Sequence, residues 1–260
     1  GQTDIEQYKS DIANLRTLSG LNASNLPTQI LATDPHTDPA TVSVGDLVEA
    51  DIDVEWSGAI AKDATILYVT VGGNQSYSVF DSLIYAIQIP LVNNDTQFVP
   101  VISISYGGCE VKDLPQSEIL QLDVYLEQAN AQGQTVVASS GDDGSADCDD
   151  SDNTNTPTTA SKGLAVDYPA SSQYVTGVGG TSFSGDLGDQ SAYWNNDNNQ
   201  DNGSALGYIP ESVWNNTPTL AGLSNAGELG ASGGGVRPIF SKPCTVAHLA
   251  HPLGRPDGFF

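Results

Sequence analysis

The sequence has few basic residues, no methionine and no long apolar run. Its 8 Lys and Arg stand against 32 Asp and Glu, which gives a formal net charge of −24 at pH 7. Nucleic acids and anionic membrane surfaces attract proteins through clustered Lys and Arg, so neither is an expected partner. No segment approaches the roughly 18 apolar residues of a membrane-spanning helix, and the first residues do not resemble a signal peptide. The absence of methionine, even at the first position, suggests a processed product or a fragment.

Charged residues make up only 15% of the chain, whereas 27 residues are Gly and 14 are Pro. This composition is typical of a loop-rich secreted protein. In acid the carboxylates become neutral, and only 8 Lys and Arg and 3 His remain to carry positive charge. Little repulsion between positive charges is then left to unfold the protein, which favours a protein that works in acid. An ordinary acidic extracellular surface is the alternative.

The three cysteines permit one intramolecular disulfide. Cys109 and Cys148 each follow an apolar segment that is predicted to be a strand, so a bridge across neighbouring strand ends is expected. Cys244 would then be unpaired. No pair of cysteines has the close spacing of a zinc site, so no metal is expected there.

Apolar residues follow helical and strand-like spacing in turn up to about residue 180. Val48, Ile52, Trp56, Ala59 and Ile60 form one helical stripe. The predicted helices cover residues 5–18, 46–61, 78–89 and 115–132, and the predicted strands cover 28–31, 64–71, 99–105, 135–139 and 174–178. Strands separated by helices of this length predict an α/β fold, with a mostly parallel sheet and helices on both of its faces. Sites in such folds gather beyond the carboxyl ends of the strands.

Glu49 and Asp53 are the first candidate site. On a helix these residues are four positions apart and share one face, where two like charges destabilise the helix unless they have a function. A coupled pair of carboxyl groups takes up protons over a wide pH range, which suits acid–base catalysis. The alternative is a capping box formed by Asp46 and Glu49, which would make Glu49 a helix-start residue only.

Asp142 is the second candidate. It follows a predicted buried strand and is flanked by Gly141 and Gly144, which would let its carboxyl group reach a bound substrate. The alternative is a simple turn, which Asp-Gly pairs favour. The run of Asp residues that continues to Asp152 lacks the spacing of an EF-hand loop, so calcium is not expected there.

The third candidate is Ser105-Tyr106-Gly107, at the end of a predicted strand, where exposed backbone could pair with an extended peptide. By itself the segment could equally be a plain strand end. Ser182 follows Gly-Thr but has no Pro four residues later, and it is interpreted as part of a strand-to-loop turn.

The three histidines, His36, His248 and His251, have no recognisable spacing to a serine and an acid. A Ser-His-Asp triad is therefore not supported.

Several short motifs, in their order and spacing, resemble the catalytic domain of the sedolisins, which are serine-carboxyl peptidases with a subtilisin-like fold. The motifs are Glu49-Ala-Asp-Ile-Asp-Val-Glu-Trp56, Ile102-Ser-Ile-Ser-Tyr-Gly107, Ser140-Gly-Asp-Asp-Gly144, Tyr168-Pro-Ala170, Val178-Gly-Gly-Thr181, Tyr208-Ile-Pro-Glu-Ser-Val-Trp214, Ser232-Gly-Gly-Gly235 and Ile239-Phe-Ser-Lys-Pro243. The resemblance covers residues 1–243. Residues 244–260 form a divergent C-terminal tail.

The resemblance implies that Glu49 is the general base, that Asp53 orients it, and that Asp142 is the acid of the oxyanion hole. A histidine base would be protonated in acid, whereas a glutamate with an ordinary pKa of about 4.3 is partly ionised there. A neutral Asp142 could donate a hydrogen bond to the oxyanion of a tetrahedral intermediate. The expected function is therefore that of a secreted endopeptidase that acts on protein or peptide substrates in acid.

The chain departs from the family pattern in its second half. The Gly-Thr-Ser-x-x-x-Pro segment that carries the nucleophile is not found, nor is the calcium site that follows it in the family. The fold is thus expected to be incomplete at both ends, this chain to be inactive, and calcium and an inhibitory propeptide to belong to a full-length form. The alternatives are a non-catalytic extracellular relic that binds peptides and a plain acidic structural domain.

Overall fold

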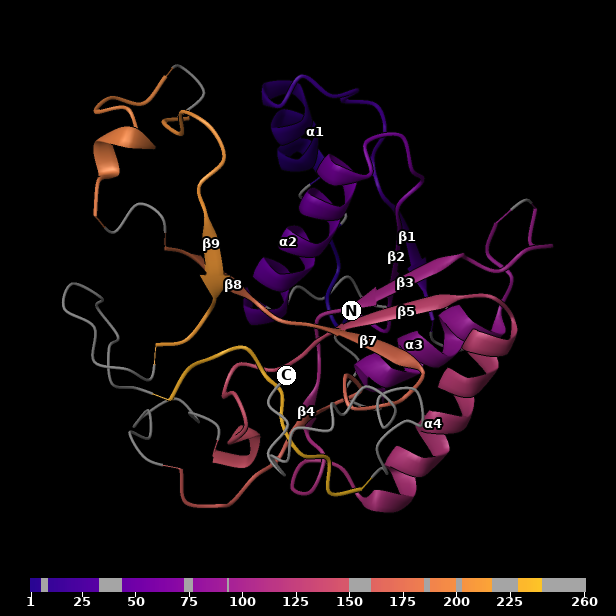
Figure 1. Ribbon diagram of the computed structural model, residues 1–260. Coiled ribbons are helices and arrows are strands. Elements are labelled where there is room, and N and C mark those ends of the chain that lie inside the picture. Colours follow the sequence, from indigo (N-terminus) through magenta and orange to yellow (C-terminus); the bar gives the residue numbers. More distant parts are fainter. Residues whose placement is uncertain are drawn as a thin grey trace. The chain divides into compact units, whose positions relative to one another are not determined.

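The computed structural model describes residues 1–5, 9–32, 44–72, 77–92, 94–149, 160–184, 188–199, 203–216 and 229–239 (Figure 1). The predictions made for His36, for Cys244 and for the tail at 244–260 lie outside the described residues. The chain divides into two compact units. Unit 1 comprises Gly1–Ser105 and Ala131–Gln134, and unit 2 comprises Tyr106–Asn130 and the described residues from Thr135 onward.

Unit 1 alternates helices and strands. Its elements are α1 (Lys9–Leu18), β1 (Thr28–Leu31), α2 (Val44–Ile60), β2 (Leu67–Thr70), α3 (Val79–Gln88) and β3 (Val101–Ile104). β1 and β2 lie side by side as a parallel pair, in register from Thr28 opposite Leu67 to Leu31 opposite Thr70 (Figure 1). A capping box starts α3, where the backbone N–H of Ser78 donates to the Asp81 carboxylate at 2.7 Å.

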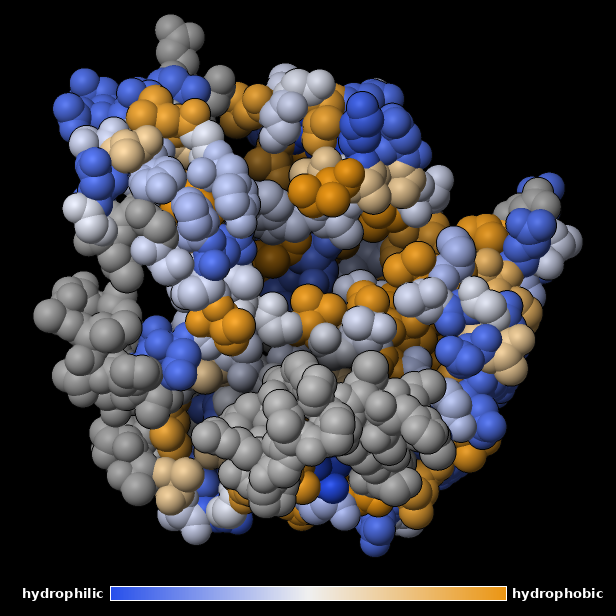
Figure 2. Space-filling model, viewed as in Figure 1, coloured by the Kyte–Doolittle hydropathy of each residue, from blue (hydrophilic) through white to orange (hydrophobic). Residues whose placement is uncertain are grey.

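The core of unit 1 brings together Ile5, Ile12 of α1, Ala50 and Val54 of α2, and Tyr68 of β2. The large apolar stripe of α2 does not face this core. The side chains of this stripe are largely exposed, at 60% for Val48, 47% for Ile52, 64% for Trp56 and 81% for Ile60. Apolar (orange) residues accordingly appear at the surface over α2 (Figure 2).

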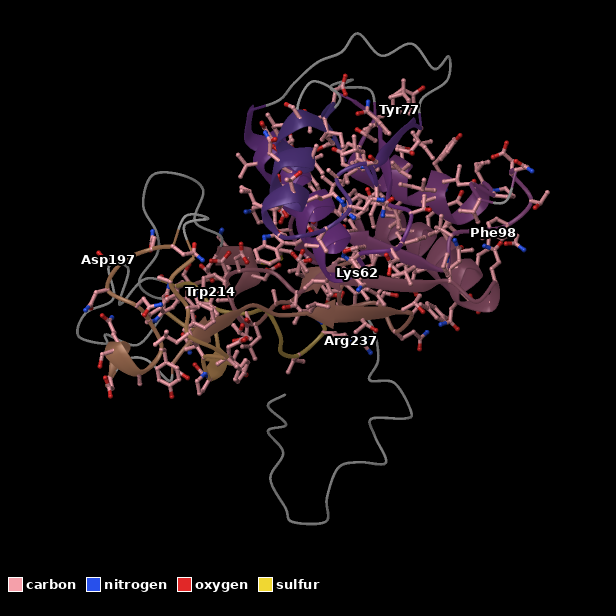
Figure 3. The ribbon with its side chains drawn as sticks, turned by 90° about the horizontal axis from the view of Figure 1, so that it is seen from above. Lys62, Tyr77, Phe98, Asp197, Trp214 and Arg237 are labelled. Carbon is pink, nitrogen blue, oxygen red and sulfur yellow. A yellow bond between two sulfur atoms is a disulfide. The ribbon has the colours of Figure 1, made fainter. Side chains whose placement is uncertain are left out.

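Small residues explain which face of α2 is buried. Ala50 and Val54 are buried, and the backbone at Gly58 lies close to α1 because the glycine has no side chain. Arg16 of α1 uses this approach and donates from Nη1 to the Gly58 carbonyl at 2.9 Å and from Nη2 to the Lys62 carbonyl at 3.0 Å. Lys62 is labelled in Figure 3. Close helix packing thus outweighs the larger apolar area of the opposite face.

Unit 2 contains a parallel pair of strands and two short antiparallel pairs. Its elements are β4 (Gly108–Cys109), α4 (Gln116–Ala131), β5 (Thr135–Ser139), the 3₁₀ turn η2 (Asp147–Asp149), β6 (Asp167–Tyr168), β7 (Val175–Val178), β8 (Thr181–Phe183), η3 (Gln190–Ala192) and β9 (Glu211–Val213). β5 and β7 are parallel, whereas β4 pairs with β6 and β8 with β9 in antiparallel fashion. Ser182 lies within β8 opposite Ser212, so its interpretation as a strand-to-loop turn is wrong.

α4 has the boundaries that its sequence favours. Pro115 precedes its first residue, and Gly133 follows with a φ of 81°, a left-handed conformation that glycine adopts without strain. Its buried side chains are Ile119, Leu122, Leu126 and Ala129. The Tyr168 hydroxyl donates to the Ile119 carbonyl at 3.3 Å and so connects β6 to α4.

The alternation of helices with parallel strand pairs confirms the predicted α/β fold class. The four predicted helices and five predicted strands are all present, β1 and β5 with the predicted bounds and the others with shifted ends. The strands that the sequence did not indicate, β4, β6, β8 and β9, have two or three residues each. Within the described residues, no helix has the length and the apolar composition needed to cross a membrane.

Candidate active site

The acid pair of Glu49 and Asp53 lies one turn apart on α2 in unit 1. The Ser105 hydroxyl, directly after β3, donates to Oδ1 of Asp53 at 2.6 Å across 52 residues of sequence. α2 begins at Val44, before Asp46, so Asp46 and Glu49 do not occupy the N-cap and N3 positions. The capping-box interpretation of Glu49 is therefore wrong.

Asp53 is half-buried, and its surroundings act on its charge in opposite directions. Burial is the largest influence and raises the pKa of Asp53, whereas the hydrogen bond from Ser105 and the charge of the Gly1 amine lower it. The Gly1 amine itself donates to the Val69 carbonyl at 2.7 Å, and its burial lowers its pKa to about 5. On balance, burial outweighs the other influences, and the pKa of Asp53 lies above its ordinary value.

Asp142 belongs to unit 2 and lies in a turn shaped by two glycines, with φ angles of 92° at Gly141 and 62° at Gly144. Its side chain is exposed. The predicted turn is thus present, and it leaves the Asp142 carboxyl group open to a ligand.

The segment around Ala231 and Gly233 holds this turn through backbone hydrogen bonds. Ala231 N–H donates to the Asp142 carbonyl at 2.7 Å, and Gly233 N–H donates to the Gly141 carbonyl at 2.9 Å. A Cβ atom at Gly233 would lie 1.5 Å from the Ser140 carbonyl oxygen, so only glycine fits there. The segments 140–144 and 232–235 are distant in sequence and are therefore held together by backbone hydrogen bonds.

Asp167 is a candidate that sequence reasoning missed. It lies in β6 with 7% of its surface exposed, and its Oδ1 atom has no hydrogen-bond partner. Burial raises the pKa of Asp167 to about 8, with further contributions from the carboxylates of Asp147, Asp142 and Asp113. Its carboxyl group lies against Gly107, where a Cβ atom would be 1.9 Å from Oδ1. Gly107, two residues after the strand predicted at 99–105, is the signal that could have indicated this close approach.

A cavity of about 200 Å³ lies next to Asp167 within unit 2. Its lining includes Ser140, Asp167, Ser171 and Arg237, and the last of these is labelled in Figure 3. Three buried oxygen atoms of the lining, Oγ of Ser140, Oγ of Ser171 and Oδ1 of Asp167, have no hydrogen-bond partner. A polar cavity of this size is suited to hold water or a polar group.

The predicted substrate-binding segment, Ser105-Tyr106-Gly107, is divided between the two units, with Ser105 ending unit 1 and Tyr106 beginning unit 2. Ser105 and Tyr106 are half-buried, and Gly107 is exposed. The side chain of Ser105 contacts Asp53, as described above, which the sequence did not indicate. Peptide binding by this segment stays a prediction.

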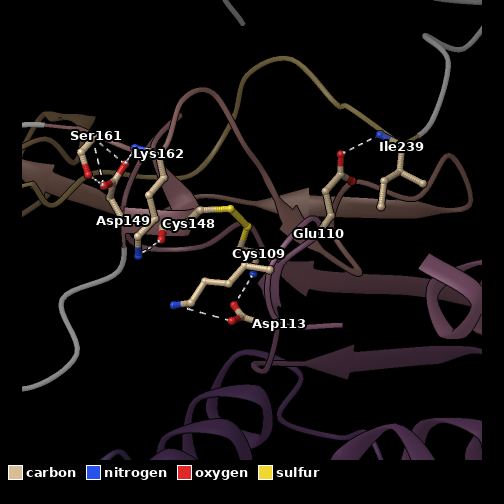
Figure 4. Close-up of a disulfide and its surroundings, with 9 residues drawn as sticks. Cys109, Glu110, Asp113, Cys148, Asp149, Ser161, Lys162 and Ile239 are labelled. Carbon is tan, nitrogen blue, oxygen red and sulfur yellow. Dashed lines mark hydrogen bonds and ion pairs between the residues drawn. A yellow bond between two sulfur atoms is a disulfide. The ribbon is translucent and has the colours of Figure 1, made fainter. Parts of the chain in front are cut away.

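A disulfide joins Cys109 of β4 to Cys148 of η2, with their Cα atoms 5.1 Å apart (Figure 4). This is the pairing that the sequence predicts. The backbone N–H of Cys109 also donates to the Asp113 carboxylate at 2.8 Å.

Asp149, next to the disulfide, accepts hydrogen bonds from Ser161 and Lys162 (Figure 4). Ser161 donates to it from its hydroxyl at 2.6 Å and from its backbone N–H at 3.0 Å, and Lys162 N–H donates at 2.9 Å. These bonds, first of all the one from the Ser161 hydroxyl, lower the pKa of Asp149. Lys162 also donates from Nζ to the Cys148 carbonyl at 2.6 Å.

In the part of the chain that the structure describes, no three His, Cys, Asp or Glu side chains are arranged to hold a metal ion. Asp152 and its neighbours in the acidic run lie outside the described residues. Calcium in a full-length form stays a prediction.

The chain matches the Subtilase family over residues 29–224. It is 30% identical to kumamolisin from Bacillus sp. (strain MN-32) over 196 residues, which cover 75% of this chain and 27% of the relative. It is 34% identical to sedolisin from Pseudomonas sp. (strain 101) over 155 residues, or 60% of this chain and 22% of the relative. With bovine (Bos taurus) tripeptidyl-peptidase 1 the identity is 33% over 137 residues, which cover 52% of this chain and 22% of the relative.

The fold is similar to that of a solved Pseudomonas sedolisin, described as a serine-carboxyl proteinase in complex with two molecules of pseudo-iodotyrostatin. The TM-score is 0.68 at 25% sequence identity, and the match covers 96% of this chain and 59% of that one. The present chain spans about a quarter of the length of the curated relatives it matches. The matched residues, the fold and the motifs around the acid pair agree, and the chain belongs to the sedolisin group of the subtilase family.

Proposed function

We propose that residues 1–243 are part of the catalytic domain of a secreted serine-type endopeptidase that works in acid. The observation that carries this proposal is the acid pair on α2, in which Ser105 holds the carboxyl group of Asp53 beside Glu49. A base made of carboxyl groups suits acidic conditions, where an imidazole base would be protonated.

Each acid has a distinct role in the proposed reaction. Glu49 takes the proton of the serine hydroxyl as its oxygen attacks the scissile carbonyl carbon, and Asp53 orients Glu49 and shares that proton. Asp142, in its neutral form, donates a hydrogen bond to the oxyanion of the tetrahedral intermediate. Glu49 then returns the proton to the leaving amine, which breaks the C–N bond and leaves an acyl-enzyme for water to hydrolyse.

The substrates are proteins or peptides that bind in extended form along Ser105-Tyr106-Gly107. The Cys109–Cys148 disulfide and the low content of charged residues support a secreted location. An inhibitory propeptide is proposed as a further partner in the full-length form.

A non-catalytic peptide-binding relic is the second candidate. It is favoured by one observation: residues 1–260 contain no Gly-Thr-Ser-x-x-x-Pro segment. Reading the gene beyond Pro243 in all three frames separates the two candidates. Such a segment in a neighbouring frame favours the peptidase, and its absence favours the relic.

The test uses the natural gene product that contains these residues, assayed for casein hydrolysis at about pH 3–5. Glu49→Gln removes the base and should lower kcat on the order of 10³-fold without unfolding the protein. Glu55→Gln, on another face of the same helix, is the matched control and should keep normal activity. Normal turnover in Glu49→Gln would refute the role of Glu49.

Residues 1–260 expressed alone should hydrolyse no casein, because the nucleophile segment is not among them. Activity in this chain that disappears in Ser182→Ala would overturn the proposed position of the nucleophile.

A further inference from the structure

We infer that Ser105, which directly follows β3, is a positioning residue of the acid pair. Its hydroxyl fixes the orientation of the Asp53 carboxylate on α2. This inference rests on the proposed function and adds a residue to it. The Ser105–Asp53 bond measures 2.6 Å, within the range of hydrogen bonds in which a hydroxyl donates to an ionised carboxylate. Both residues belong to unit 1.

Other titratable groups lie near Asp53. Asp46 and Glu49 lie on the same helix, the charge of the Gly1 amine lowers the pKa of Asp53, and Asp53 in turn acts through its charge on Tyr68 of β2. The amine directs its own hydrogen bond to the Val69 carbonyl. Ser105 thus provides a directional contact to the carboxyl group, and such a contact can set its orientation.

The bond also affects the protonation of the pair. Burial favours the neutral form of Asp53, and the hydroxyl of Ser105 opposes this by donating to the ionised form. Without the hydroxyl, Asp53 keeps its proton to higher pH and is free to rotate. It can then neither accept a proton from Glu49 nor hold Glu49 in place.

Ser105 is in addition the first residue of the segment proposed to bind peptides. A substrate that pairs with the backbone of residues 105–107 would therefore bind beside the group that orients the acid pair. Substrate binding and orientation of the base are coupled through this one residue.

The test is a carbon-13 NMR titration of the Asp carboxyl groups in the 260-residue chain. Ser105→Ala should move the titration midpoint of Asp53 upward, and Ser105→Thr, which keeps the hydroxyl, should restore it. Ser57→Ala is the matched control, because the Ser57 hydroxyl donates to the backbone carbonyl of Asp53 and not to its carboxylate. If Ser105→Ala fails to fold by circular dichroism, Ser105→Cys, a similar-sized but weaker donor, replaces it with the same expected shift.

In the natural gene product, Ser105→Ala should lower kcat about tenfold, in line with the loss of one hydrogen bond to a charged group, and Ser105→Thr should recover it. An unchanged Asp53 midpoint in Ser105→Ala, or an equal shift in Ser57→Ala, would overturn the inference. A lack of peptidase activity in the unmodified protein would count against the proposed function instead. The NMR titration tests the Ser105 contact independently of catalysis.

Discussion

The half-buried Asp53 of unit 1 and the buried Asp167 of unit 2 differ in their hydrogen-bond partners. Asp53 lies on a helix and accepts a hydrogen bond from a serine hydroxyl, although burial still raises its pKa. Asp167 lies against glycine backbone, has no partner at Oδ1, and has its pKa raised to about 8. Asp149, also in unit 2 and less exposed than Asp167, accepts several hydrogen bonds, and its pKa is lowered. One donor is thus outweighed by burial at Asp53, whereas several donors outweigh it at Asp149.

The contrast bears on acid tolerance. A carboxyl group that is neutral in the folded protein does not need to take up a proton when the pH falls. Asp167 is such a group below about pH 8, so acidification does not change the charge of this carboxyl group.

Replacing Asp167 should have the largest effect, and the quantity that should change is the dependence of stability on pH. Because its folded-state pKa lies above its ordinary value, the folded protein binds more protons than the unfolded chain between about pH 4 and pH 8. Stability therefore falls as the pH rises through this window, by on the order of 4 kcal/mol at pH 7. Asp167→Asn should remove this loss and flatten the pH profile in urea unfolding.

Asp197→Asn, at an exposed carboxyl group, is the control for that experiment and should leave the profile unchanged. A slope that persists in Asp167→Asn would assign the pH dependence to other groups.

Opening the disulfide should have the next largest effect and should be confined to unit 2. Cys109 and Cys148 are 39 residues apart, and a closed loop of this size stabilises a fold by about 4 kcal/mol. Replacing both cysteines by Ser should lower the free energy of unfolding by that amount, and hydrogen exchange should quicken in β4 and η2 more than in α1 and α2.

Peptide mapping without reductant should yield one fragment that joins Cys109 to Cys148, with Cys244 as a free thiol. Free thiols at both positions in oxidised, folded protein would contradict the pairing.

The smallest change in the free energy of unfolding is expected for substitutions on the exposed face of α2 in unit 1. Trp56→Ser removes a large side chain that is 64% exposed and should change the free energy of unfolding by less than about 0.5 kcal/mol. Val54→Ala removes two buried methyl groups and should cost about 2 kcal/mol. Equal costs in thermal unfolding would mean that both faces of α2 are covered.

The sequence predicted the main elements well because helical and strand-like spacing are local properties. The spacing of Glu49 and Asp53 on one helix face was predictable for the same reason. The buried face of α2 was not, because Ala50 and Val54 are small and the larger apolar residues dominated the pattern. The short strands β4, β6, β8 and β9 span too few residues to show any period.

Contacts between residues that are distant in sequence could not be predicted either. The hydrogen bond from Ser105 to Asp53 and the approach of Asp167 to Gly107 join residues more than 50 positions apart, and no local pattern marks such pairs. The roles of Glu49, Asp53 and Asp142 came from resemblance to a family and stay predictions until the variants are measured.

The hydrogen bonds from Ser161 and Lys162 to Asp149 have a consequence for how this protein can be altered. They hold residues 161 and 162 against residue 149, next to Cys148, which the disulfide already links to Cys109. Once the two ends of a loop are fixed, each doubling of its length adds only about 0.6 kcal/mol of closure entropy. Longer or different sequences, such as an affinity tag or a protease-recognition peptide, could therefore be inserted between these anchors with little loss of stability.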